Sequence, residues 1–407
     1  MTQLHVHAVS ACDTASALRL LDAELPASAA PRMVFAFYGC QHDDHLLHRH
    51  LRHRYPGAAL LGGTSSGGVM THRGVLDRQS IGLLLIEDEA GEFGVAAAPL
   101  GDDAAKTAQN LLLEALSNAG CSGQLPELIW IYQAPGREEA VVEGLRRVVG
   151  DHCPIVGGSS ADDDVCGLWR QLGPQGPMQD GLVVGVLLPS SAIGCAFQGG
   201  YEPAGPSGIV TGIGDRTSGP GGLVTATTGR EIVSIDDQPA AAVYNRWTGG
   251  RIAQQLAHGG TVLAATSMCP IATDAGLIDG VSNFLLIHPE AVGEGGSLRT
   301  FCNLEVGSRI HAMTGDKTRL VDRAGRVAAQ ALRTLPPGHG GVAGALVVYC
   351  GGCRLAVGDE VARVSTAVAA SLGAAPFIGC FTFGEQGQLL NRNVHGNLMI
   401  SAVVFSR

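Results

Sequence analysis

Five of the fourteen histidines lie within twelve residues, 42–53. On a helix, His50 falls in the apolar stripe that Leu47 and Leu51 define, whereas most of the other histidines face outward. An imidazole in an apolar stripe is the kind of group that ligates haem iron. A hydrogen-bonded core histidine or a histidine-rich surface explains the same pattern, and both interpretations stay open. The candidate haem ligands are His50, His72 and His395.

Three cysteines follow strands that are expected to be neighbours. Cys350 and Cys353 lie in YCGGCR, and Cys380 lies in GCFTFGE. Parallel strands in one sheet end at one edge, which would bring the three thiols together. Such a cluster could bind Zn²⁺ or an iron–sulfur cluster, or act as a redox pair. Buried inert thiols are the alternative, because Cys40 ends an equivalent strand and a second CxxC is missing.

Glycine-rich loops with hydroxyl side chains recur at the ends of three strands, as GGTSSGG, GGSSADD and GCFTFGE. In open α/β sheets, ligands favour the crevice beyond the carboxyl ends of the strands. Glycine also serves tight turns and hydroxyls also cap helices, so each loop has a structural explanation too. The candidate ligand-binding residues are Gly63, Thr64, Ser65, Gly158, Ser159, Ser160, Thr382 and Glu385.

Several known chemistries lack their motifs here. The sequence contains no GxxxxGK[ST] loop and no GxGxxG between a strand and a helix, which argues against nucleotide hydrolysis and dinucleotide binding. The loops also fail the GxSxG pattern of serine hydrolases. Asp162, Asp163 and Asp164 could bind a hard cation or form a solvated turn.

The elements that position these residues form a repeat. Each copy is an apolar strand, a helix and a second strand that runs into a glycine-rich loop, followed by a further apolar strand. A strand–helix–strand of this length needs a crossover, so its two strands are parallel, and the strand after the loop is expected to return antiparallel. The helices are expected at residues 44–54, 137–149 and 359–372.

The copies fall into two related halves. Residues 199–222 contain nine glycines and three prolines, which is typical of a linker. After it, a hairpin around TGR and a helix from about Pro239 are expected. We therefore predict an α/β fold with added antiparallel strands and mixed sheets, divided into domains at residues 1–200 and 223–407 with a linker at 201–222.

Composition and charge limit the kinds of partner that we expect for this protein. The chain has 407 residues and a net charge of −10, which argues against nucleic acid and against a membrane surface. Eleven cysteines, an odd number without a regular framework, suggest reduced thiols in a cytoplasm. No signal peptide or transmembrane stretch is recognised, so we expect a soluble cytoplasmic protein.

The ordered motifs give the sequence a family likeness. MVFAFYGCQHDDHLLHRHL, AALLGGTSSGG, PIVGGSSADD, TGREIVSIDDQPAAAVY, FIGCFTFGEQG and NVHGN together resemble FIST proteins, which have an N-terminal and a C-terminal FIST domain. The resemblance implies a signal-input module that binds small ligands. One branch is a haem-based nitric-oxide sensor that regulates a histidine kinase or a cyclic-di-GMP enzyme. His395 in NVHGN matches a family His-Asn signature only in part, since Gly396 intervenes.

The sequence therefore leaves two hypotheses about function open. The first is a cytoplasmic small-ligand sensor, with haem as the cofactor that the resemblance implies, acting on a partner kinase or cyclic-di-GMP enzyme in trans. The second is an enzyme or a Zn or Fe–S protein that uses Cys350, Cys353 and Cys380, with Glu385 as an acid or base.

Overall fold

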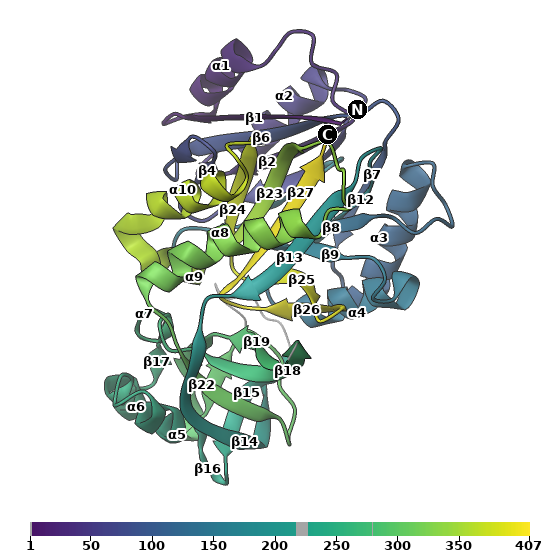
Figure 1. Ribbon diagram of the computed structural model, residues 1–407. Helices are drawn as coiled ribbons and strands as arrows, with labels where there is room; N and C mark the ends of the chain where they lie inside the picture. Colours follow the sequence, from purple (N-terminus) through teal and green to yellow (C-terminus); the bar gives the residue numbers. More distant parts are fainter. Residues whose placement is uncertain (1, 217–226, 279) are drawn as a thin grey trace.

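In the computed structural model, the described part of the chain forms three six-stranded sheets and a smaller β-rich domain (Figure 1). The structure describes residues 2–216, 227–278 and 280–407. The three sheets stand together in the upper part of Figure 1, and the smaller domain lies below them. Both chain termini lie at the top, away from the smaller domain. The predicted α/β fold class with mixed sheets is confirmed.

Each of the three sheets is built mainly from the strands of one repeat unit. The first unit contains β1 (Gln3–Ser10), α1 (Thr14–Glu24), β2 (Met33–Tyr38), α2 (Asp44–Arg54), β3 (Ala59–Thr64), β4 (Val69–Thr71), β5 (Gly74–Val75) and β6 (Ser80–Glu87). The second contains β7 (Glu92–Pro99), α3 (Ala104–Asn118), β8 (Leu128–Gln133), α4 (Glu138–Val149), β9 (Ile155–Ser159), β10 (Gln171–Gly173), β11 (Gly176–Met178) and β12 (Gly181–Leu188).

The third unit is split by an insertion. It contains β13 (Ile193–Gly199), α8 (Lys317–Arg333), β23 (Val342–Cys350), α9 (Gly351–Val357), α10 (Val361–Ser371), β24 (Phe377–Thr382), β25 (Glu385–Leu389), β26 (Arg392–Gly396) and β27 (Met399–Ser406). The helix after the first strand of each unit begins behind an aspartate whose carboxylate accepts a backbone N–H at 2.9 Å, namely Asp13, Asp103 and Asp316.

The repeat predicted from sequence is confirmed in its pairing. The strands on either side of each crossover helix are parallel, β2 with β3, β8 with β9 and β23 with β24. The strands that follow the loops, β6, β12 and β27, return antiparallel. Strands at the centre of a sheet are covered on both faces, which explains why MVFAFY is buried at every position.

The units exchange hairpins in a cycle, which the repeat alone did not predict. The sheet orders are β1-β6-β2-β3-β10-β11, β7-β12-β8-β9-β25-β26 and β13-β27-β23-β24-β4-β5. The first unit receives the β10–β11 hairpin of the second, the second receives β25–β26 of the third, and the third receives β4–β5 of the first. Each sheet is thus completed by a neighbour, which gives the three units a pseudo-three-fold arrangement.

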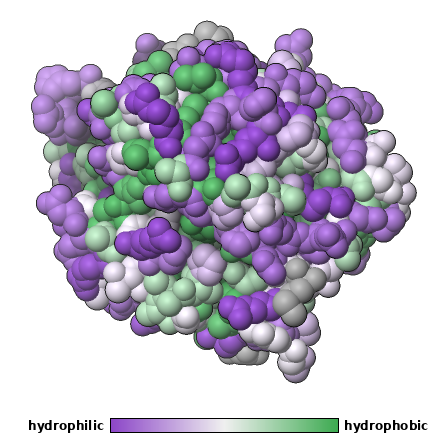
Figure 2. Space-filling model, turned by 90° about the horizontal axis from the view of Figure 1, so that it is seen from above, coloured by the Kyte–Doolittle hydropathy of each residue, from purple (hydrophilic) through white to green (hydrophobic). Residues whose placement is uncertain are grey.

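The core lies between the three sheets. Inward-facing side chains from all three units form one buried cluster that includes Phe35, Trp130, Leu346 and Cys380. Phe35 meets Trp130 edge to face, with ring centroids 5.4 Å apart. Alternate residues of the same strands point outward, where the helices of each unit cover them in three further clusters. The outer surface seen from above is mostly polar, with hydrophobic residues in narrow bands (Figure 2).

The smaller domain is inserted between β13 and α8. It contains β14 (Glu202–Arg216), β15 (Thr227–Ile235), β16 (Gln238–Pro239), α5 (Ala240–Trp247), α6 (Ala253–His258), β17 (Gly260–Thr261), α7 (Leu263–Thr266), β18 (Ile271–Ile278), β19 (Val281–Ile287), β20 (Pro289–Val292), β21 (Leu298–Thr300) and β22 (Arg309–Thr314).

Most of the segment predicted as a linker is a strand of this insertion. Residues 202–216 form the strand β14, which pairs with β15 and β22, so they belong to a sheet despite their glycine content. Irregular steps in both ladders accommodate glycine and proline there. The rest of the linker, residues 217–222, and part of the hairpin predicted around TGR lie outside the described residues. The helix predicted from about Pro239 is α5.

Candidate functional site

The three glycine-rich loops meet at a cyclic junction. Ala161 N donates to Thr64 O, Ser66 N donates to Phe381 O, and Phe383 N donates to Ser159 O, each at 3.1 Å. The three donors occupy equivalent positions in the repeat, and so do the three acceptors. Loops from all three units are thereby held together where β3, β9 and β24 end, which is where α/β folds place ligands.

A central cavity of about 140 Å³ adjoins this junction, at the boundary with the smaller domain. It is lined by residues of all three units and of the insertion: Ser66, Pro135, Gly136, Glu138, Asp163, Val165, Arg230, Leu263, His288, Phe301, Cys350, Gly351, Gly352, Arg354, Leu355 and Phe383. Volumes of about 300 to 1,000 Å³ are usual for drug-sized ligands, so this cavity suits a smaller molecule.

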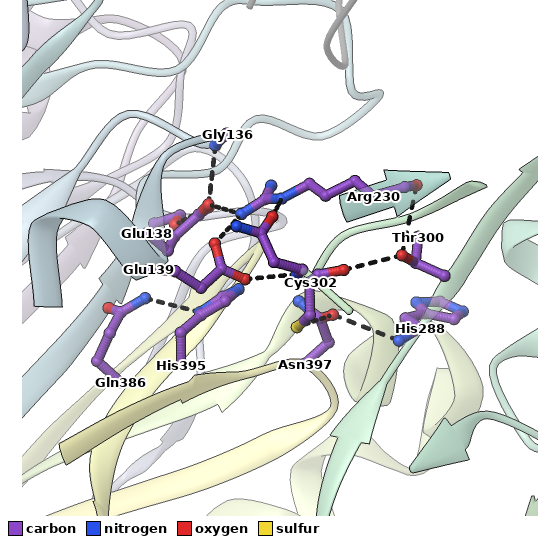
Figure 3. Close-up of polar contacts among 12 residues, drawn as sticks. Gly136, Glu138, Glu139, Arg230, His288, Thr300, Cys302, Gln386, His395 and Asn397 are labelled. Carbon is purple, nitrogen blue, oxygen red and sulfur yellow. Dashed lines mark hydrogen bonds and ion pairs between the residues drawn. The ribbon is translucent and has the colours of Figure 1, made fainter. Parts of the chain in front are cut away.

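A buried ion pair joins the smaller domain to the second unit at this cavity (Figure 3). Arg230 of β15 is 2% exposed and donates from Nη2 to Glu138 of α4 at 2.7 Å. Glu138 also accepts from Ser159 Oγ at 2.7 Å and from Gly136 N at 3.0 Å. Burial opposes ionisation of this carboxyl, but Arg230 and these hydrogen bonds hold the pKa of Glu138 down at about 2.

Arg230 also contacts the neighbouring carboxylate, Glu139, and donates from Nε to Asn303 Oδ1 at 3.0 Å. The pKa of Arg230 is raised by the two glutamates in spite of its burial. The guanidinium is therefore a permanent cation that fixes the smaller domain against α4.

A second arginine faces the cavity without a carboxylate partner. Arg354 of α9 donates from Nη2 to Gly67 O at 3.0 Å and lies over the Phe381 ring, 5.2 Å from its centroid. Among the described residues, its Nε has no hydrogen-bond partner and no carboxylate lies within ion-pairing distance. Burial lowers the pKa of Arg354, an effect that Asp163 partly opposes. A half-buried, unpaired guanidinium favours an anionic or strongly accepting ligand group.

The remaining lining is a neutral histidine and apolar side chains. Burial lowers the pKa of His288 to about 4, although its Nε2 contact with Leu263 O, at 3.2 Å, acts in the other direction. Val165 has a φ of 55°, which β-branched residues rarely adopt. Strain of this kind gathers at functional sites, because the surroundings must hold it in place.

The predicted loop residues lie next to the cavity instead of lining it. None of Gly63, Thr64, Ser65, Gly158, Ser159, Ser160, Thr382 and Glu385 is part of the lining; all are buried in the junction. Their neighbours Ser66 and Phe383, one residue further along, do reach the cavity. Thr382 Oγ1 donates to Glu385 Oε1 at 2.8 Å. Burial, followed by the proximity of Cys350, raises the pKa of Glu385 well above its usual value.

The three candidate histidines lie far apart in the fold. His50 of α2 contacts Asp22 at 3.0 Å on the outer face of the first unit. His72 lies in the turn between β4 and β5, where burial lowers its pKa. His395 of β26 is buried beside Glu139 and Cys302. None of them lines the central cavity.

The three candidate cysteines are divided between two faces of their sheet. Cys380 belongs to the core between the sheets, whereas Cys350 and Cys353 belong to the outer cluster under the helices of the third unit. Burial, and then the proximity of Cys353, raises the pKa of Cys350 well above its usual value. A reactive thiol needs a lowered pKa, so this environment is the opposite of a nucleophile's.

The acidic run has a structural role at Asp162. Its carboxylate accepts hydrogen bonds from the backbone N–H groups of Cys166 and Leu168 and so stabilises the turn between them.

Comparison with protein families decides the relationship. The FIST N domain profile matches residues 32–217, and the FIST C domain profile matches residues 240–388. The chain belongs to the FIST family. FIST domains are sensor domains of signal transduction, so the protein has a sensory role. The FIST N match spans most of the first two units, and the FIST C match spans most of the insertion and of the third unit, so the central cavity lies between the two FIST domains.

Solved structures add little to this assignment. The structure of cyanuric acid hydrolase from A. caulinodans is similar over 100% of this chain and 99% of that chain, with 9% identity and a TM-score of 0.35. PurLQS from Thermotoga maritima is similar over 78% and 72% of the two chains, with 10% identity and a TM-score of 0.19. No curated protein matches the sequence.

Of the described helices, none combines the length and apolarity needed to cross a membrane.

Proposed function

We propose that this FIST protein senses a small organic acid, which binds in the central cavity with its carboxylate against Arg354. The observation that carries the proposal is the half-buried Arg354 guanidinium without a carboxylate partner. Arg354 lines the cavity, so a ligand carboxylate can take the place of the carboxylate partner that this guanidinium lacks among the described residues. Phe301, Phe383 and Leu263 provide an apolar wall for the body of the ligand.

The central cavity does not favour haem as the ligand. The cavity of about 140 Å³ is smaller than the usual space for a drug-sized ligand, and a porphyrin is at least as large as such a ligand. None of the three predicted haem ligands, His50, His72 and His395, lines that cavity. Its lining does include His288, whose Nε2 lies 3.2 Å from Leu263 O and is engaged there. We therefore propose a small ligand in place of haem-based nitric-oxide sensing. A visible spectrum of the purified protein without a Soret band supports this choice, and a stoichiometric Soret band contradicts it.

Ligand binding is expected to act on the position of the smaller domain. Arg230 and His288 reach the cavity from the insertion, whereas Arg354 and Ser66 reach it from the sheets. A ligand that contacts both sides favours one relative position of the two parts. We propose that a partner protein, a histidine kinase or a cyclic-di-GMP enzyme, responds to that position in trans. All eleven cysteines are free thiols, which supports a reducing, cytoplasmic setting.

A binding experiment tests the ligand class. Small carboxylic acids are compared with their amides, which have similar shape and no charge, by thermal shift and calorimetry. We expect some acids to bind and their amides to bind at least tenfold more weakly. Arg354→Gln should weaken the binding of those acids roughly 10- to 100-fold. Arg363→Gln, which alters an exposed arginine paired with Glu360 on α10, is the matched control and should bind like the wild type.

Two results would count against the proposal. Acids and amides that bind equally would remove the role of charge, and an unchanged affinity in Arg354→Gln would move the ligand elsewhere. The signalling step is measured separately, as kinase autophosphorylation or cyclic-di-GMP turnover by a candidate partner with and without the ligand-bound protein. The wild type should change the partner's rate when the acid is present, and Arg354→Gln should not.

A further inference from the structure

A second group of polar residues lies on the other side of the Arg230 ion pair, outside the central cavity. Glu139 of α4, Cys302 after β21 and His395 of β26 each place one ligand-type atom within 4.8 Å of the other two (Figure 3). The three residues come from the second unit, the insertion and the third unit. All three line a second cavity of about 310 Å³.

We propose that Glu139, Cys302 and His395 form a binding site for Zn²⁺. Carboxylate, thiolate and imidazole are its usual protein ligands, and a thiolate with an imidazole selects zinc over magnesium or calcium. Tetrahedral zinc places its ligand atoms about 3.3 to 3.7 Å apart, so side-chain rotations close the remaining gap. The Cys302 thiol releases its proton to solvent as the zinc–sulfur bond forms, and a water molecule occupies the fourth position.

The imidazole of His395 is prepared for such a ligand. The side chain is 5% exposed, and its Nε2 atom has no hydrogen-bond partner among the described residues. Buried polar atoms are seldom left unpaired, because an unmade hydrogen bond is costly. A metal ion bound to Nε2 would account for this atom.

The amide side chain of Gln386 supports the same assignment. Gln386 lies 3.1 Å from His395 Nδ1 through its Nε2, and its Oε1 has no partner among the described residues. Rotating the amide by half a turn lets Oε1 accept from Nδ1–H, which leaves Nε2 of the imidazole free to bind metal. Asn397 Oδ1 accepts both from the Cys302 thiol at 2.9 Å and from the backbone N–H of His288 at 3.3 Å, so this amide orients the Cys302 side chain.

The local charge also suits a divalent cation. Glu138 and Glu139 carry two negative charges, and Arg230 supplies one positive charge, so this group has a net charge of −1. Adding Zn²⁺ and removing one thiol proton brings the total to zero. Glu139 accepts from Asn303 N at 2.8 Å with Oε1, and each carboxylate oxygen has a second lone pair for a metal.

Metal titration of the full chain tests this proposal. The protein is depleted of metal with a chelator, dialysed against Zn²⁺ and analysed for bound metal, and its affinity is measured by competition with a zinc-binding dye. We expect one tightly bound ion per chain. Co²⁺ in place of Zn²⁺ should give the absorption of tetrahedral cobalt together with a sulfur-to-metal charge-transfer band.

Variants show whether these three residues hold the ion. Cys302→Ser should remove the charge-transfer band, and Cys302→Ser, His395→Gln and Glu139→Gln should each weaken zinc binding by more than the roughly 10- to 100-fold typical of groups that only orient a metal ligand. Cys121→Ser is the control, because Cys121 is a buried thiol hydrogen-bonded to Glu92 elsewhere in the fold. Its affinity should equal that of the wild type.

The outcomes are decisive even where one variant fails to fold. Circular dichroism of the metal-free proteins identifies such a variant, and Glu139→Gln, which changes a partly exposed side chain, then provides the comparison. Zinc binding that persists unchanged in the folded variants, or a wild type that binds neither Zn²⁺ nor Co²⁺, overturns the proposal. Neither result bears on the organic-acid site, which is tested through Arg354.

Discussion

Arg230 and Glu138 form an ion pair of 2.7 Å in which the side chains are 3% and 4% exposed. One belongs to the insertion and the other to the second unit, so this contact joins parts of the chain that are 92 residues apart. Removing one partner leaves an uncompensated buried charge, which is far more costly than losing a surface pair.

Arg230→Met should therefore reduce the free energy of unfolding by about 3–5 kcal/mol. Arg319→Met, which breaks the exposed contact with Glu202, should cost less than about 1 kcal/mol. The double variant Glu138→Gln/Arg230→Met should regain part of the loss, because no lone buried charge at Glu138 remains. Urea denaturation at pH 7 measures all three. Equal losses for the Arg230 and Arg319 variants would show that the buried pair contributes nothing special.

Acid should weaken the protein through His288. Its pKa is about 4 when folded and about 6.5 in the unfolded chain, so between these values the unfolded chain binds a proton that the folded chain excludes. Stability is consequently lost as the pH falls from about 6.5 to 4, by roughly 3 kcal/mol in total. His288→Gln should flatten this part of the profile, and His53→Gln, an exposed position, should not. Denaturation curves at pH 7, 6 and 5 that are parallel for wild type and His288→Gln would disprove the assignment.

Glu385 should behave in the opposite direction. Burial raises its pKa, so at pH values between the ordinary and the raised pKa the folded protein retains a proton that the unfolded chain has lost. Stability therefore falls as the pH rises from about 4.5, the ordinary value for glutamate, towards the folded pKa. Glu385→Gln resembles the protonated side chain and should raise the free energy of unfolding at pH 7 and reduce its dependence on pH. Thermal unfolding at pH 5 and pH 8 checks this. A variant less stable than the wild type at both pH values contradicts it.

Gly157 should tolerate no side chain. A Cβ added there would lie 1.9 Å from the carbonyl oxygen of Ile131 on the neighbouring parallel strand. Gly157→Ala should cost at least about 1–3 kcal/mol, as other overpacked positions do. Gly57→Ala is the control, because nothing lies within 4 Å of its added Cβ. A midpoint of urea denaturation that shifts equally in both variants would show that the close approach is not limiting.

Gly384 should control the orientation of His395. An added Cβ would lie 2.5 Å from the imidazole Cε1, so Gly384→Ala must displace the ring. If the zinc site is as proposed, we expect affinity for Zn²⁺ to fall by about tenfold or more. The cobalt spectrum should also change. An unaltered spectrum and affinity in a well-folded Gly384→Ala protein would place the metal ligand elsewhere.

The sequence was sufficient for local structure. The helix predicted at residues 44–54 has those limits, and the return strands β6, β12 and β27 pair as expected, because apolar runs and crossover lengths are local signals. The hairpin exchange could not be predicted in this way. Gln171 pairs with Gly63, more than a hundred residues earlier, and neither segment carries a pattern that identifies the other.

The sequence predicted the region of the candidate site but not the residues that line its cavity. The glycine-rich loops do lead to the cavity, but Ser66 and Phe383 reach it instead of Ser65 and Thr382, since the direction of a side chain in a loop depends on tertiary contacts. Arg230 and Glu138 were missed. Arg230 is a lone arginine at the start of an apolar strand, and Glu138 is one of two glutamates at the start of a helix. Both patterns are common on protein surfaces. These residues are buried only because the insertion packs against α4.

The cyclic exchange of hairpins has a consequence for how the chain can be divided or synthesised. A nascent first unit lacks its outer strands until Gln171–Met178 have left the ribosome, and the second unit waits for Glu385–Gly396 near the end of the chain. A fragment cut between the two FIST domains would therefore display unpaired strand edges, which invite aggregation. Co-expressed halves should reassemble by strand complementation, whereas either half alone should be insoluble.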